Sequence, residues 1–158
     1  MGSLFDTIFG LPVHALVVHA AVVFVPLAAL GAILMALRPS FSRRFGTLEV
    51  IVAAVAAASS FVAKESGEQL AARVGTPEQH AELGAVMPLV AGGLFLLVLV
   101  FWLFDRGIPA NKFRPVWLRV LGVIMILASL VALYWTIRVG HTGAVAAWSA
   151  IIENTKPG

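Results

Sequence analysis

Four long apolar stretches dominate this sequence and leave few folds open to it. They cover residues 11–37, 48–66, 81–104 and 116–138, and a helix of about 20 apolar residues is enough to cross a bilayer. Hydrophobic residues make up 60% of the 158-residue chain and charged residues only 12%, which excludes an ordinary soluble domain. Because lipid offers the backbone no hydrogen-bond partners, spanning segments of this length must be helical. We therefore expect an all-α integral membrane four-helix bundle, with residues 1–158 as a single transmembrane domain.

The two ends of the chain have a different pattern. The segments "SLFDTIFG" (3–10) and "AVAAWSAIIEN" (144–154) mix apolar, aromatic and polar residues. This composition is typical of helices that lie in the membrane interface. We predict short interfacial amphipathic helices at both ends of the bundle.

The basic residues indicate how the bundle is oriented. Seven of the eleven Lys and Arg residues lie in or beside the first and third connections between the apolar stretches, namely Arg38, Arg43, Arg44, Arg106, Lys112, Arg114 and Arg119. Positively charged connections stay on the cytoplasmic side of a membrane. We expect a multi-pass protein of the bacterial inner membrane with both termini outside, and we read no cleaved signal peptide at its start. The excess of basic over acidic residues therefore reflects membrane topology, and nucleic-acid binding is not expected.

Residue types narrow the chemistry further. The chain has no cysteine, so disulfides, thiolate metal sites and cysteine-held iron–sulfur clusters are excluded. Ser59 and Ser60 lie in the Ala-rich second stretch with no general base nearby, and no glycine-rich phosphate loop is present. The chain is therefore not expected to be an enzyme on its own, and any metal would be held by His, carboxylate or Met side chains.

All four histidines are predicted to lie at the outer end of the bundle. His14 and His19 fall near the start of the first apolar stretch, His80 opens the third, and His141 follows the fourth. At 3.6 residues per turn, a separation of five places His14 and His19 about 140° apart on a helix. The two rings should therefore face different neighbours and not chelate one small ion together. The simpler alternative is that His19 hydrogen-bonds a neighbouring backbone carbonyl while His14 caps the membrane interface.

One haem b near the outer face would satisfy such histidines, because bis-histidine ligation needs one ring from each side. We expect His19 and His80 as the axial pair, with His14 and His141 as second ligands or proton partners. Gly84, one turn after His80, leaves room for a flat macrocycle, although ordinary close helix packing explains it equally well. The ammonium of Lys64 or the guanidinium of Arg138 could meet a haem propionate.

A metal site without haem is the competing interpretation. Glu65 and Glu68 share a helix face if the second helix continues past Lys64, and His80 and His141 would complete a mixed set. Carboxylate and imidazole ligands suit Zn, Cu or Fe. Against this, the surrounding segment also reads as a solvated outer loop whose charges face water.

Several of these motifs together resemble one family. "LPVHALVVHAAVVF", "ESGE", "HAELG" and "GHTGAVAAW" occur in the order found in the bacterial family known as domain of unknown function 2231, whose members are small four-helix membrane proteins. Here Ala15 replaces the proline that follows the first histidine, and Ala20 and Ala21 replace a Phe-Pro pair. Both rings are kept. The resemblance implies a redox setting, because such domains occur beside or fused to Rieske-type and other redox proteins.

Together these features predict a membrane electron-transfer or accessory subunit with an outward-facing His/Glu site for haem b or a redox metal, within a respiratory assembly. Its partners would be the lipid bilayer and other membrane or redox subunits. Two alternatives stay open: a non-catalytic membrane protein with a Zn or Cu site, and a purely structural subunit that docks on partner helices.

Overall fold

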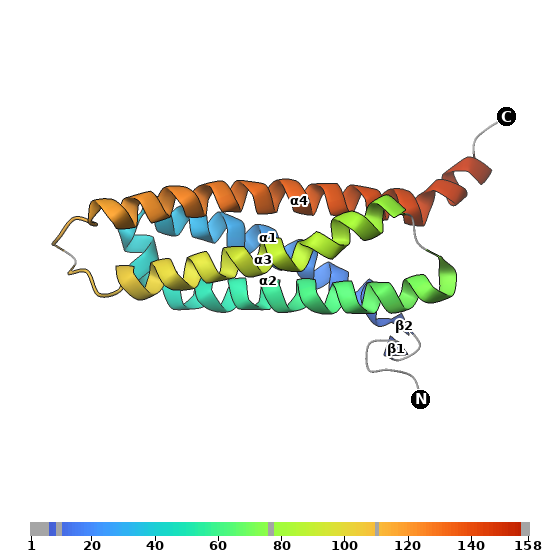
Figure 1. The fold of residues 1–158 in the computed structure, drawn as a ribbon, viewed down its shortest axis with the longest axis horizontal. Coiled ribbons are helices and arrows are strands. Elements are labelled where there is room, and N and C mark those ends of the chain that lie inside the picture. Colours follow the sequence, from blue (N-terminus) through green and yellow to red (C-terminus); the bar gives the residue numbers. More distant parts are fainter. Residues whose placement is uncertain (1–6, 9–10, 76–77, 110, 156–158) are drawn as a thin grey trace.

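The computed structural model describes residues 7–8, 11–75, 78–109 and 111–155. Two two-residue strands, β1 (Thr7–Ile8) and β2 (Leu11–Pro12), pair antiparallel before the first helix. Four helices follow, listed by their bounds as α1 (Val13–Leu37), α2 (Pro39–Val74), α3 (Glu78–Asp105) and α4 (Val116–Asn154). Figure 1 shows them running alternately up and down, so that α1 begins and α4 ends at the same end of the bundle.

The predicted fold class is confirmed. All four helices are long and apolar enough to cross a membrane. Large apolar side chains are exposed along every helix, including Leu30, Phe61, Leu89 and Ile137. A lipid environment removes the cost of exposing such a surface, which water would impose.

The helices are longer than the apolar stretches that predict them. α2 begins at Pro39, a residue suited to the first helical turn, and it continues through "KESGEQLAARV" to Val74. The first two segments interpreted as connections, 38–47 and 67–80, are therefore largely helical in their described residues, whereas the third is not. Hydropathy marks where a helix meets lipid, whereas Ala, Glu, Gln, Leu and Arg sustain the helix beyond it.

The predicted short terminal helices are not found as separate elements. The segment 144–154 is helical but continuous with α4, because neither Gly140 nor Gly143 breaks the helix. At the other end, Thr7 and Ile8 belong to β1, and the rest of the predicted N-terminal helix lies outside the described residues.

The core follows one repeating pattern on every helix, with inward positions separated alternately by four and three residues. We call each such row of positions a seam. On α1 and α2 the seams are His14, Val18, Ala21, Val25, Ala28, Ala32 and Met35, and Ser42, Gly46, Glu49, Ala53, Ala56, Ser60, Ala63 and Gly67. On α3 and α4 they are His80, Gly84, Met87, Ala91, Leu94, Val98, Phe101 and Asp105, and Leu118, Gly122, Met125, Ser129, Ala132, Thr136, Val139 and Gly143. A seven-residue repeat of this kind gives left-handed packing, and its small residues let the backbones approach closely.

The seams also reveal an internal repeat. Each α3 seam residue from His80 to Phe101 has a number 66 higher than its α1 counterpart, as His14 and His80 show. Each α4 seam residue has a number 76 higher than its α2 counterpart. The hairpin of α1 and α2 and the hairpin of α3 and α4 therefore bury the same pattern of positions. Within the bundle each helix packs mainly on two neighbours, which leaves α1 and α3 diagonally opposite.

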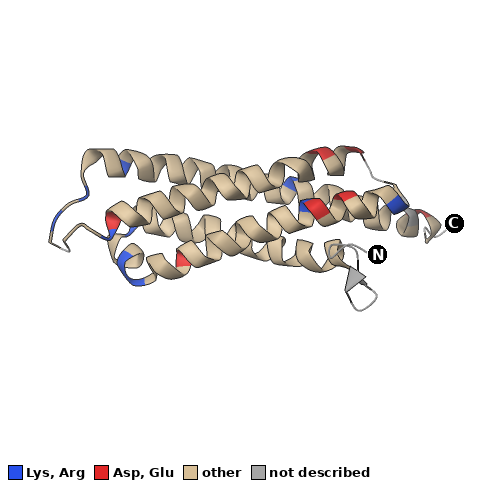
Figure 2. Cartoon of the chain, turned by 60° about the horizontal axis from the view of Figure 1, so that its bottom comes forward, with Lys and Arg blue, Asp and Glu red and all other residues tan. Residues whose placement is uncertain are grey.

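A buried polar network joins the helices at the end that carries the α1–α2 and α3–α4 connections. Arg114 donates two hydrogen bonds to Asp105, from Nε and Nη2, both of 2.7 Å, and a third of 2.6 Å to the carbonyl oxygen of Ala36. Ser42 donates to the same carboxylate at 2.5 Å. The network thus connects the end of α1, the start of α2, the end of α3 and the segment before α4. Figure 2 shows Lys and Arg concentrated at this end, which we call the arginine end.

Replacing Arg114 by Met should lower the free energy of unfolding by about 3–5 kcal/mol, because it leaves the Asp105 carboxylate buried without its partner. The measurement is denaturation of the purified protein in mixed micelles. Arg119→Met, which removes an exposed arginine from the same end, is the matched control and should change stability little. Equal losses in the two variants would contradict a structural role for the buried pair.

Candidate functional site

Two histidines face each other at the opposite end of the bundle, which we call the histidine end. His14 begins the α1 seam and His80 begins the α3 seam, so the two half-buried rings project inward from diagonal helices. Their ring centroids are 6.4 Å apart and their planes meet at 79°. The rings therefore lie on opposite sides of the bundle axis.

The space around the rings is a large cavity formed where the seams open. Its volume is about 1,320 Å³, and its lining includes His14, Ser60, Gly67, His80, Thr136 and Gly143. Typical small-molecule pockets measure roughly 300–1,000 Å³. The cavity is thus a widening of the core at the histidine end, and its volume is large enough for a large ligand.

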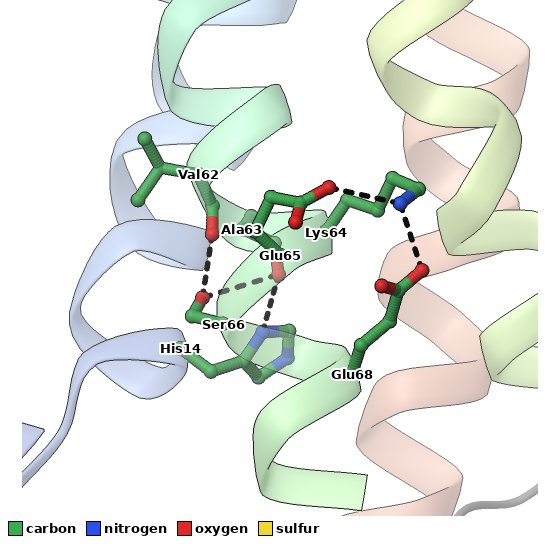
Figure 3. A network of polar contacts seen from close by, with 7 residues as sticks. All are labelled: His14, Val62, Ala63, Lys64, Glu65, Ser66 and Glu68. Carbon is green, nitrogen blue, oxygen red and sulfur yellow. Dashed lines mark hydrogen bonds and ion pairs between the residues drawn. The ribbon is translucent and has the colours of Figure 1, made fainter. Parts of the chain in front are cut away.

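The His14 ring is oriented by α2. Its Nδ1 lies 2.8 Å from the carbonyl oxygen of Ala63, as Figure 3 shows. A carbonyl oxygen can only accept a hydrogen bond, so Nδ1 must carry a proton, and in the neutral ring Nε2 then has the lone pair. Ser66 donates to the carbonyl oxygens of Val62 at 2.6 Å and of Ala63 at 3.2 Å.

The His80 ring is oriented by α4 in the same manner. Its Nδ1 lies 3.1 Å from Oγ1 of Thr142, whose hydroxyl donates to the carbonyl oxygens of Arg138 and Val139, each at 3.1 Å. Since that hydroxyl proton is engaged, Oγ1 accepts from His80 Nδ1. In both rings the hydrogen bond to the neighbouring helix is made by Nδ1, so Nε2 is the nitrogen left to face a ligand.

Each ring packs against a glycine on the next helix. A Cβ atom at Gly67 would lie 3.0 Å from ring atoms of His14, and one at Gly143 would lie 3.0 Å from Cε1 of His80. Ser66 and Gly67 correspond to Thr142 and Gly143 in the second hairpin. The two hairpins therefore supply the same half-site, a histidine on one helix and a hydroxyl residue followed by glycine on its neighbour.

The remaining predicted histidines are placed differently. His19 lines the cavity, but its ring is exposed and its Nδ1 bonds the Ala15 carbonyl oxygen of its own helix at 2.5 Å. His141 is exposed on α4, outside the cavity lining. The structure thus brings His14 opposite His80 and does not bring His19 or His141 there.

The acidic residues of the predicted metal set are engaged with one lysine. Lys64 Nζ lies 3.0 Å from Glu65 and 2.8 Å from Glu68, and Figure 3 shows the ammonium between the two carboxylates. Over the part of the chain that the structure describes, no three His, Asp or Glu side chains lie close enough to hold a metal ion. Glu65, Glu68, His80 and His141 accordingly do not form a common ligand set.

Sequence reasoning missed Thr142, Gly67 and Gly143 as parts of the site. A signal was present, because Ser66-Gly67 and Thr142-Gly143 repeat the same dipeptide type beside the two hairpins' histidines. The repeat of this dipeptide can be recognised only when the seams show that Ser66-Gly67 in the first hairpin corresponds to Thr142-Gly143 in the second.

Comparison with known proteins gives one match. The model of the family described as "Predicted membrane protein (DUF2231)" matches residues 10–156. A search of curated proteins and a search of solved structures gave no match.

Gly67→Ala should destabilise the protein by about 1–3 kcal/mol, because the added methyl group presses on the His14 ring. Gly84→Ala is the matched control on the same cavity. Nothing lies within 4 Å of a Cβ there, so the substitution should stabilise its helix by about 0.5–1 kcal/mol. Denaturation in mixed micelles measures both, and a Gly67→Ala protein as stable as Gly84→Ala would contradict the described contact.

Proposed function

This chain belongs to the DUF2231 family of predicted membrane proteins, and we propose that it is a membrane electron-transfer protein that holds one haem b between His14 and His80. The observation that carries the proposal is the pair of facing imidazoles, each with Nδ1 hydrogen-bonded to the neighbouring helix, so that Nε2 is the nitrogen available to a ligand. Outer-shell hydrogen bonds of this kind fix the ring orientation and tautomer of metal-ligating histidines.

The number of ligands favours haem over a bare ion. Zn or Cu(II) sites normally use three or four protein ligands, and the described residues offer no such group. A haem brings four nitrogen ligands of its own and needs only two axial side chains.

The spacing of the rings supports the same conclusion. A metal bound by two imidazole nitrogens at about 2.0–2.1 Å each has ring centroids about 6 Å apart, since each centroid lies roughly 1 Å behind its nitrogen. The centroids of His14 and His80 are 6.4 Å apart. The separation of the two rings thus matches that of two imidazoles on one metal ion.

The cavity supplies the space that a macrocycle would need. Its volume is about 1,320 Å³, and its lining includes Gly84, where a Cβ atom would have no neighbour within 4 Å. Among the described residues of the cavity lining, Lys64 is the cation, and because Glu65 and Glu68 already engage its ammonium, a haem carboxylate would have to compete with them for it.

A bound haem supplies reversible one-electron chemistry. The chain's own residues would orient the two ligands. The apolar seam residues between the cavity and the arginine end would keep water from that side of the haem, and the charged residues around the cavity would set its electrostatic environment. If the arginine end is cytoplasmic, as the positive-inside rule indicates, the site lies near the external face and serves redox partners there. The chain would then be one electron-carrying subunit of a larger respiratory assembly.

The test is the visible spectrum of the purified protein after incubation with haem. We expect a Soret band of low-spin bis-histidine character that is lost or converted to high spin in His14→Ala and in His80→Ala. His19→Ala and His141→Ala are the controls and should keep the wild-type band, because neither ring faces His80.

Two outcomes would contradict the proposal. A folded wild-type protein that binds no haem would favour the purely structural subunit, or a metal site if stoichiometric metal is present. A band lost in His19→Ala but kept in His14→Ala would exclude His14 as the ligand.

A further inference from the structure

One carboxyl group lies in the buried core of the bundle, between the arginine end and the histidine end. Glu49 occupies the α2 seam, its residue is 6% exposed, and its Oε1 is buried with no hydrogen-bond partner in the described part of the chain. It lies eleven residues before the cavity residue Ser60, about 16 Å along the helix. Between the histidine pair and the Asp105 network, it is the one ionisable side chain on the four seams of the described structure.

The neighbouring helix is shaped around this carboxyl group. A Cβ atom at Gly31 of α1 would lie 1.8 Å from Oε2 of Glu49 and 2.3 Å from its Cδ. Any other residue at position 31 would therefore displace the carboxyl group. Gly31 and Glu49 together form a socket for a carboxyl side chain inside the membrane.

Packing alone does not require this socket. The second hairpin repeats the first, and its residues at the equivalent positions are Leu97 and Met125, both apolar. Met125 is completely buried. The same layer of the bundle is thus filled by hydrocarbon in one hairpin and by a carboxyl group above a glycine in the other.

The contrast with Asp105 identifies what the carboxyl group can bind. Asp105 is equally buried, but it has an arginine and a serine as partners and remains a carboxylate. No cation faces Glu49 from the seams of α1, α3 or α4. An isolated carboxylate in a low-dielectric interior is so costly that such a group takes up a proton instead.

We propose that Glu49 is a proton-binding site in the interior of the bundle, with Gly31 as the socket that holds its carboxylic acid. The ligand is a proton that exchanges with water. This site does not depend on the proposed haem and can be tested in its absence.

Infrared spectroscopy of the full chain in phospholipid nanodiscs at neutral pH tests the proposal. We expect a carbonyl-stretch band of a protonated carboxylic acid that shifts to lower frequency in D₂O. The band should be lost in Glu49→Gln and in Glu49→Met, the latter carrying the residue of the second hairpin. Glu68→Gln, which removes an exposed acid from the same helix, should leave the band unchanged.

Absence of the band from the folded wild-type protein, or its persistence in Glu49→Gln, would overturn the proposal. Gly31→Ala provides a second arm: it should shift or abolish the band and lower the melting temperature, and Glu49→Ala in the same chain should restore that temperature. A Gly31→Ala protein with unchanged band and melting temperature would exclude the socket. Failure of haem binding leaves all of these outcomes as they are, so the two proposals fail separately.

Discussion

The buried ion pair between Arg114 and Asp105 is the interaction on which the arrangement of the helices most depends. Lipid removes the hydrophobic force that drives helices together in water, so packing of small residues and a few polar contacts must set their positions. This network reaches four parts of the chain through Ala36, Ser42, Asp105 and Arg114. By fixing the register of the helices at one end, it also determines which residues share a layer at the other.

The layer that results contains His14 and His80. From the network, the seams continue in steps of four and three through apolar and small residues to the two histidines. The stiffness of close-packed helices carries the register over that distance. The polar groups at the two ends are therefore linked mechanically, although no hydrogen bonds connect them.

Much of the fold could be predicted from the sequence, but the site only in part. The apolar stretches gave the number and order of the helices, and the spacing of His14 and His19 correctly indicated that the two rings face different surroundings. Which ring faces the axis could not be read, because lipid makes the outside of each helix as apolar as its inside. His19 directly follows the seam position Val18 and so falls outside the row, whereas His14 begins it. Glu49 was missed for a related reason, since distance from the loops does not reveal the face on which a carboxyl group lies.

The repeated hairpin has a consequence for how such a bundle can arise and vary. One hairpin carries a histidine, its orienting partner and the glycine beside it, so two separate copies related by a two-fold axis would assemble the same facing rings as a homodimer. An assembly of identical copies must give both rings the same partner. In the joined chain one ring is paired with a backbone carbonyl and the other with a threonine hydroxyl, so the two rings have different surroundings. Joining the two hairpins in one chain thus allows the two sides of the site to differ, which two identical hairpins related by a two-fold axis could not do.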